Sequence, residues 1–232
     1  MRDLRIIFMG TPEFAVGVLK KMVADKNNIV AVITSPDKPA GRGRKLRESA
    51  VKEYSRSQNI PILQPTNLKD EQFLDQLKSF NANLQVVVAF RMLPKLVWEM
   101  PEYGTFNLHA SLLPQYRGAA PINWAIINRE QKTGVSTFLI DDKIDTGAIL
   151  LTKEVALSER ETVRSLHDKL MLLGGSLVLE TITLFKTNKI NPILQPQNNS
   201  LKIAPKLTKE NTKINWSQSV IKVDAFIRGL NP

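Results

Sequence analysis

The sequence predicts an α/β protein with a doubly wound, mostly parallel sheet. Through the first half of the chain, short apolar runs alternate with stretches of helical periodicity, as expected when helical crossovers join parallel strands. One run, Leu84–Phe90, is apolar almost without interruption, which is typical of a strand buried on both faces. Both observations favour a sheet covered by helices.

The first half of the chain begins with a predicted strand at Arg5–Met9 and a turn at Gly10-Thr11-Pro12. Pro12 suits a helix start, because its φ is already helical and its missing N–H has no helical partner there. The turn contains a single glycine, so the three-glycine pattern of nicotinamide dinucleotide binding is absent. The other predicted elements of this half are strands at residues 29–34, 60–63 and 84–90 and helices at residues 47–57 and 69–80.

The second half has a different order of elements. The longest predicted helix carries Val163, Leu166 and Leu170 at spacings of three and four. His167 lies beside them and is interpreted as a side chain at the edge of the core rather than a catalyst. The predicted elements are strands at residues 105–109, 134–140 and 148–155, helices at residues 121–128, 162–185 and 217–228, and a polar segment at residues 186–215.

Composition excludes several classes of protein. The chain has 232 residues, of which 43% are apolar and 23% charged, values ordinary for a globular protein. No apolar run reaches the length of a membrane span and the N-terminus does not resemble a signal peptide, so a cytoplasmic protein without a membrane partner is expected. The sequence contains no cysteine and only two histidines, so neither a thiolate nucleophile nor a metal site is expected.

A net charge of +10 favours an anionic partner such as nucleic acid, although a merely basic surface is the alternative. Part of the charge is concentrated in a loop that Pro36, Pro39, Gly41 and Gly43 are expected to keep irregular. Such a loop can contact phosphates or remain a solvated surface segment. Its cations are Lys38, Arg42, Arg44, Lys45 and Arg47.

The segment that carries chemistry begins with Asn107 and His109. Side chains alternate along a strand, so these two share one face. An amide can stabilise an oxyanion and an imidazole can take a proton, which together suit acyl transfer. A hydrogen-bonded surface pair is the alternative.

A second polar segment lies between two predicted strands and holds Asp141, Asp142 and Asp145. One of these carboxylates could orient His109 and raise its basicity. A calcium site is the rival interpretation, but the spacing and distal Glu of an EF-hand are missing. An ordinary acidic turn remains open.

Together these segments resemble the formyltransferase family that uses 10-formyltetrahydrofolate. The two signature segments of the family are matched by Asn-x-His-x-Ser-Leu-Leu-Pro at residues 107–114 and by Asp-Thr-Gly at residues 145–147. The branch that acts on methionyl-tRNA is matched further, at residues 10–15, 36–43, 111–121 and 228–232. The resemblance covers essentially the whole chain and implies a Rossmann-like formyltransferase fold.

The resemblance also implies an activity. Formyl would pass from N10 of the folate to the amine of methionine esterified to initiator tRNA, in support of translation initiation. Asn107 would stabilise the oxyanion, His109 would assist proton transfer, and Asp145 would orient His109 or relay protons through water. The donor is a co-substrate, no metal is implied, and a monomer is expected.

Further residues are assigned roles by the same resemblance. The folate pocket would be lined by Arg91, Met92, Leu93, Ser111, Leu112, Leu113, Pro114, Ile140, Asp141 and Asp142. The acceptor end of the tRNA would contact Arg42, Arg44 and Lys45.

Two features depart from the family pattern. Lys143 stands where the family often has glycine, and the sequence stops where a C-terminal β-barrel domain is expected to begin. Residues 1–206 are therefore predicted as the catalytic domain, and residues 207–232 as a linker and helix that lead to the absent barrel.

Two alternative functions stay open. A formyltransferase of a small amine, such as glycinamide ribonucleotide or an amino sugar nucleotide, would share the same reaction centre, and the basic loop argues for tRNA instead. A non-catalytic RNA-binding module would keep the fold without the reaction, and the presence of Asn107, His109 and Asp145 argues against it.

Overall fold

The chain forms two units, and each is described by itself. The first comprises Met1–Leu108 and Val178–Ile190, and the second comprises His109–Leu177 and Asn191–Pro232. The predicted boundary at residue 206 falls inside the second unit and stays a prediction. The computed structural model describes residues 1–40, 45–196 and 200–231.

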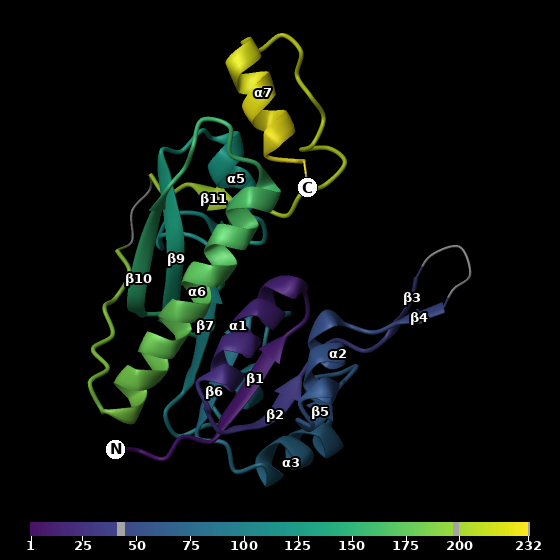
Figure 1. Ribbon diagram of the computed structural model, residues 1–232, viewed down its shortest axis with the longest axis vertical. Helices are drawn as coiled ribbons and strands as arrows, with labels where there is room; N and C mark the ends of the chain where they lie inside the picture. Colours follow the sequence, from purple (N-terminus) through teal and green to yellow (C-terminus); the bar gives the residue numbers. More distant parts are fainter. Residues whose placement is uncertain (41–44, 197–199, 232) are drawn as a thin grey trace. The chain divides into compact units, whose positions relative to one another are not determined.

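The first unit is built on a parallel sheet of five strands (Figure 1). Its order is β7-β6-β1-β2-β5. The chain therefore places β2 and β5 on one side of β1 and then β6 and β7 on the other side. This order is the doubly wound arrangement that the sequence predicts. The strands are β1 (Ile6–Gly10), β2 (Ile29–Ile33), β5 (Ile62–Leu63), β6 (Leu84–Val88) and β7 (Thr105–His109).

The strand order reverses between β1 and β6, and open α/β sheets bind ligands at the carboxyl ends of the strands at such a point. Gly10 ends β1 there. A Cβ atom on Gly10 would lie 2.6 Å from the Cβ of Ala15 and 2.9 Å from the carbonyl oxygen of Val88. The glycine therefore allows the turn to pack closely against both α1 and β6.

Helices flank this sheet, as expected for strands that are apolar on both faces. All five residues of β1 and all five of β6 are buried. Phe106 of β7 stacks on Phe185 of α6 with ring centroids 5.8 Å apart. The helices are α1 (Glu13–Ala24), α2 (Ala50–Ser57), α3 (Glu71–Ser79), α4 (Lys95–Trp98) and the end of α6 (Val163–Lys186).

The basic loop differs from its prediction. Its ends form two short antiparallel strands, β3 (Lys38–Ala40) and β4 (Lys45–Arg47), which pair Lys38 with Arg47. The expectation of an irregular segment was therefore wrong at both ends, because proline is tolerated in a two-stranded ribbon where its missing N–H can face solvent. Helix α2 starts at Ala50 rather than at residue 47, since the hydroxyl of Ser49 caps it by accepting the N–H of Lys52 at 3.0 Å.

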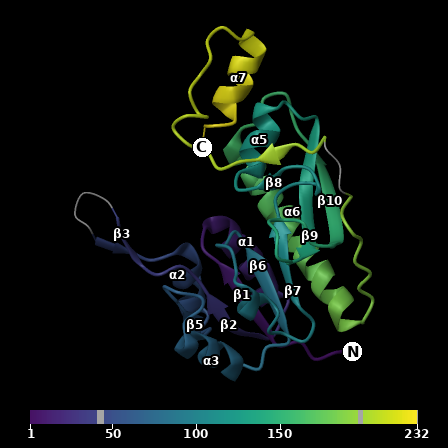
Figure 2. The same cartoon turned by 180° about the vertical axis from the view of Figure 1, so that it is seen from behind.

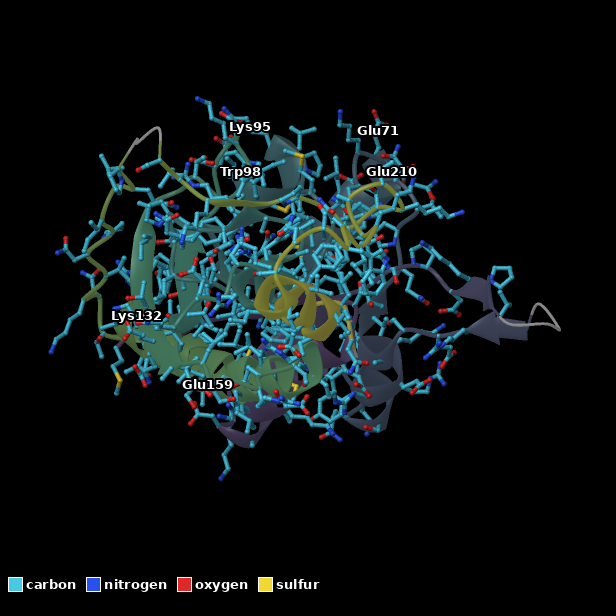
Figure 3. The ribbon with its side chains drawn as sticks, turned by 90° about the horizontal axis from the view of Figure 1, so that it is seen from above. Glu71, Lys95, Trp98, Lys132, Glu159 and Glu210 are labelled. Carbon is cyan, nitrogen blue, oxygen red and sulfur yellow. The ribbon has the colours of Figure 1, made fainter. Side chains whose placement is uncertain are left out.

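Helix α4 was not predicted, because four residues are too few to show helical periodicity. It follows Pro94, and an ion pair joins its first residue, Lys95, to its C-cap residue, Glu99, with 3.3 Å between Nζ and Oε1. Figure 3 shows Lys95 pointing outward from this helix.

The second unit is organised around an antiparallel pair of strands, β9 (Lys132–Leu139) and β10 (Ile149–Ala156) (Figure 2). Partly exposed and fully exposed positions alternate along much of β10, as expected for a strand with one solvated face. A tight loop joins the strands, and a Cβ atom on Gly147 would lie only 1.7 Å from the carbonyl oxygen of Leu139. The loop therefore requires glycine at its end.

The remaining elements of the second unit include two that the sequence did not predict. β8 and β11 are parallel strands of two residues each, too short for any periodic signal. The elements are β8 (Arg117–Gly118), α5 (Pro121–Ile127), the first part of α6, β11 (Ile203–Ala204) and α7 (Val220–Arg228).

The start of α6 is held by Glu161, which is 2% exposed. Its carboxylate accepts hydrogen bonds from the Nζ of Lys169 at 2.6 Å, from the hydroxyl of Ser165, and from the backbone N–H of Ser158 at 3.2 Å. Burial opposes ionisation, but these donors prevail and lower the pKa of Glu161.

The predicted fold class is confirmed by the parallel sheet with its flanking helices. No helix in the described parts of the chain combines the length and apolar character that crossing a membrane requires.

The substitution Glu161→Gln should lower the free energy of unfolding by about 1–3 kcal/mol at pH 7, because it removes a charged acceptor from buried donors. A lowered folded-state pKa adds stability above the ordinary pKa of glutamate, and this contribution is lost as pH falls through the folded pKa. The difference from wild type should therefore shrink below about pH 4.3. Urea unfolding at several pH values measures it.

Glu159→Gln is the matched control, because Glu159 is an exposed carboxylate two residues away that Figure 3 shows at the surface. This variant should stay within about 0.5 kcal/mol of wild type. An equal loss in both variants would contradict the role given to Glu161.

Candidate functional site

Asn107 and His109 lie on the same strand, β7, at its carboxyl end. Their spacing of two residues puts both side chains on one face of the strand. Asn107 is half-buried and His109 is buried. The arrangement expected for an amide and an imidazole on one strand is therefore present.

The ring of His109 is fixed by a backbone carbonyl. Its Nε2 lies 2.8 Å from the carbonyl oxygen of Tyr116. Because a carbonyl oxygen only accepts hydrogen bonds, Nε2 carries the proton in the neutral ring and Nδ1 keeps its lone pair. The imidazole and the ring of Phe138 form a T-shaped pair, with ring centroids 6.5 Å apart at an interplanar angle of 84°.

Tyr116 presents this carbonyl because its backbone is left-handed, with φ of 61°. Contacts on both sides hold it there: its N–H donates to the carbonyl of Lys202 at 2.6 Å, and its hydroxyl donates to the carboxylate of Glu130. Burial and the neighbouring Glu130 raise the pKa of the Tyr116 phenol, so it stays protonated and can donate. Asn128 completes the arrangement by donating to the phenol oxygen at 3.0 Å.

Asp145 faces the other nitrogen of His109. Its Oδ2 lies 3.7 Å from Nδ1, and it accepts the backbone N–H of Gly118 at 2.8 Å. Asp145 also has a left-handed backbone, with φ of 54°, a conformation that aspartate tolerates better than most residues. The structure thus brings His109 and Asp145 together.

The other carboxylates of this loop have different surroundings. Asp141 accepts hydrogen bonds from the hydroxyl of Thr146 at 2.7 Å and from the backbone N–H of Lys143 at 3.0 Å. These bonds close the loop on itself, so Asp141 shapes the segment that presents Asp145. Asp142 and Lys143 are exposed.

Two side chains that fix Asp145 were missed by the sequence analysis. Gln195 donates from Nε2 to the carbonyl of Asp145 at 3.0 Å and to the carbonyl of Gly147 at 2.7 Å. Arg117 in turn donates to the Oε1 of Gln195 at 2.7 Å and 3.1 Å. Gln195 is buried although it lies in the polar segment, where a single glutamine gives no distinguishing signal.

The segment after His109 is tied to β9. The hydroxyl of Ser136 donates to the carbonyl of Ser111 at 2.7 Å and accepts the N–H of Leu113 at 3.0 Å. Leu113 is buried, whereas Leu112 and Pro114 are partly exposed. Four predicted folate-pocket residues, Ser111 to Pro114, are therefore held in place, and a fifth, Ile140, directly follows β9.

Arg91, Met92 and Leu93 belong to the first unit and follow β6. The guanidinium of Arg91 donates to the backbone carbonyl of Thr66 at 2.9 Å and to that of Pro65. Met92 is 68% exposed and Leu93 is buried. These residues lie at the carboxyl edge of the parallel sheet, beside its point of reversal.

The remaining predicted residues are those of the basic loop and His167. Arg42 and Arg44 lie outside the described residues, and Lys45 is the first residue of β4. His167 is half-buried on α6, and its Nδ1 lies 2.9 Å from Oδ1 of Asp168.

The geometry of His109 and Asp145 allows them to handle a proton together. Nδ1 can accept a proton in the tautomer that Tyr116 sets, and the resulting imidazolium would then face a carboxylate. An amide such as that of Asn107, two residues before His109 on β7, can donate to a developing oxyanion. These groups suit transfer of an acyl group to an amine, with no covalent bond to the protein.

Comparison with known proteins gives a consistent result. Residues 4–182 match the formyl transferase family. A methionyl-tRNA formyltransferase of Flavobacterium johnsoniae is 60% identical over 232 residues, which is all of this chain and 74% of that protein. A methionyl-tRNA formyltransferase of Bacteroides thetaiotaomicron is 54% identical over 233 residues, covering 99% of this chain and 72% of that protein.

Solved structures share the fold at lower identity. A 4-N formyltransferase from Francisella tularensis superposes with a TM-score of 0.75 at 18% identity, covering 99% of this chain and 88% of that chain. A sugar 3N-formyl transferase, solved in the presence of dTDP and 5-N-formyl-THF, has a TM-score of 0.72 at 22% identity, covering 99% of this chain and 80% of that chain.

The substitution Gln195→Leu should lower the free energy of unfolding by about 1–3 kcal/mol, because the carbonyls of Asp145 and Gly147 lose their buried donor. Chemical denaturation measures the loss. Gln131→Leu is the control, since the side chain of Gln131 is exposed. Wild-type stability in the Gln195 variant would show that these hydrogen bonds contribute nothing to holding the loop.

Proposed function

The chain belongs to the formyl transferase family, and from that premise we propose how its residues transfer a formyl group to the amine of methionyl-tRNA. The observation that supports this activity is sequence identity. Over nearly its whole length, the chain is 60% and 54% identical to two methionyl-tRNA formyltransferases. The chain acts as an enzyme of protein biosynthesis that formylates methionine on its tRNA.

The donor we propose is 10-formyltetrahydrofolate, which supplies a formyl group bonded to N10. Support comes from the sugar 3N-formyl transferase of the same fold that was solved with 5-N-formyl-THF. The chemistry of the reaction centre fits such a donor, because Asn107 provides a hydrogen-bond donor for the formyl oxygen and His109 provides a base for the attacking amine.

His109 is the proposed proton acceptor. The α-amine must lose a proton as its nitrogen bonds to the formyl carbon, and the lone pair on Nδ1 is the free basic position in the tautomer set by Tyr116. The C–N10 bond of the donor breaks as the new C–N bond forms. The proton given up by the amine is balanced by the one gained at N10.

Asn107 and Asp145 would stabilise the charges of this step. The amide of Asn107 donates to the formyl oxygen where negative charge develops. Asp145 faces Nδ1 of His109 at 3.7 Å, so its carboxylate stabilises the imidazolium. Gly118 and Gln195 hold the Asp145 segment in this position.

The folate-binding role is proposed for residues at two places in the chain. Ser111–Pro114 follows the reaction centre and is fixed by Ser136, and Ile140–Asp142 leads into the loop of Asp145. Arg91–Leu93 follows β6 at the edge where α/β sheets bind ligands.

Binding of the tRNA acceptor end is proposed for Arg42, Arg44 and Lys45. The support is their charge and their place in the sequence between Lys38 and Arg47, which pair with each other across β3 and β4. Arginine forks and lysine ammonium groups are the usual protein partners of phosphate.

The choice of acceptor tests the function directly. With 10-formyltetrahydrofolate as donor, the chain should formylate initiator methionyl-tRNA and leave glycinamide ribonucleotide and an amino sugar nucleotide unmodified. Transfer of radiolabelled formyl to each acceptor measures this preference. Formylation of a small amine alone would refute the tRNA assignment and leave the reaction centre intact.

The roles within the reaction centre are tested by single substitutions. His109→Ala should lower kcat about 10²–10⁴-fold, as expected for loss of a general base. Asp145→Asn should keep an oxygen that can accept the Gly118 N–H while removing the charge that faces His109. Single-turnover transfer rates measure both effects, with circular dichroism to establish that the variants fold.

His167→Ala is the matched control, because His167 is the other of the two histidines of the sequence and its Nδ1 lies 2.9 Å from Oδ1 of Asp168 on α6. It should change the transfer rate far less than His109→Ala. Near-normal turnover of the His109 variant would rule out the proposed base.

A further inference from the structure

Within the described part of the second unit, a cavity of about 660 Å³ lies between the end of α5 and residues 213–226. It is separate in sequence from every residue assigned to the reaction centre. Three basic side chains line it, Arg129, Lys213 and Lys222, and no acidic side chain does. A lining of this kind is suited to an anion.

The three cations are available to a ligand. All are exposed, and none forms an ion pair with a residue that the structure describes. Lys202 of the same unit differs, because its Nζ lies 2.5 Å from Oε1 of Glu130. Three basic side chains without counter-charges around one cavity repel one another, and an anion would relieve that repulsion.

The rest of the lining fits more than a simple ion. The amides of Asn128, Asn215 and Gln218 offer hydrogen-bond donors and acceptors. Ile127 and Phe226 add apolar surface. Cations, amides and apolar surface together suit a phosphate with the ribose and base attached to it.

The walls of the cavity are held together by the packing of α5 against α7 (Figure 2). The side chain of Asn123 donates to the carbonyl of Gly229 at 2.8 Å, and a Cβ on Gly229 would lie 2.5 Å from Cγ1 of Ile127. Trp124 donates to the carbonyl of Pro205 at 2.8 Å. The site is therefore formed before any ligand arrives.

We propose that this cavity binds a phosphodiester segment of the RNA whose aminoacyl end is formylated. The inference rests on the proposed function, which supplies an RNA-linked acceptor. Because all three cations are exposed, the cavity is open to a chain that enters and leaves it, as a polynucleotide does. It is a second RNA contact, distinct from the basic loop.

The test is binding of uncharged initiator tRNA to the chain at a series of salt concentrations. The triple variant Arg129→Gln, Lys213→Gln, Lys222→Gln should bind at least about tenfold more weakly at low salt. Its plot of log affinity against log salt should be less steep by about 2–3, because each lost phosphate contact removes just under one unit of slope. Fluorescence anisotropy with labelled tRNA gives both values.

The matched control is Lys69→Gln, Lys78→Gln, Lys189→Gln, which removes the same charge from exposed lysines of the first unit. Its slope should change far less. If the slope changes equally in both triple variants, the effect comes from net charge alone and the proposal is overturned. A cavity variant with the wild-type slope would also overturn it. Titration with AMP is a second measurement. If the cavity variant loses AMP binding but binds tRNA as wild type does, the proposal is also overturned.

Kinetics separate this inference from the proposed function. In the cavity variant, kcat/KM for methionyl-tRNA should fall about tenfold more than kcat/KM for a short fragment that carries methionine on a 3′-terminal nucleotide. Equal losses with both acceptors would overturn the cavity and leave the function standing. If wild type formylates no acceptor, the proposed function fails. The salt dependence of tRNA binding then still tests whether the cavity binds RNA.

Discussion

The hydrogen bond from His109 to the carbonyl of Tyr116 is the contact on which the reaction centre depends. It holds the ring and selects the tautomer in which Nδ1, the nitrogen that faces Asp145, is free to take a proton. The carbonyl points at the ring because Tyr116 is left-handed, and the side chain of Tyr116 is tied to Glu130 and Asn128. The chemistry of one histidine thus rests on the conformation of a residue seven positions later.

The backbone segment from Tyr116 to Gly118 positions both His109 and Asp145. Gly118, with φ of 121°, donates its N–H to the carboxylate of Asp145. A Cβ on Gly118 would lie 2.5 Å from the carbonyl oxygen of Ala204, so the strand pair β8–β11 closes over it. His109 and Asp145 are therefore positioned by one short piece of backbone, which couples their placement more tightly than two separate supports would.

The parts of the molecule that have a local signal could be predicted from sequence. Alternation put Asn107 and His109 on one face of a strand, and apolar runs marked the strands of the parallel sheet. Other features have no such signal. Gln195 is one polar residue in a polar segment, and the strand at Ile203–Ala204 has only two residues. The β3–β4 hairpin was hidden by prolines and glycines that usually indicate irregular loops.

The dependence of Asp145 on Gln195 has a consequence for synthesis of the protein. The two residues are 50 positions apart, and chains grow from the N-terminus at roughly 5–20 residues per second. A nascent chain that ends before Gln195 holds Asn107, His109 and Asp145 but lacks the donor that fixes the Asp145 loop. The centre can therefore mature only seconds after its own residues have been made, once the last part of the second unit leaves the ribosome.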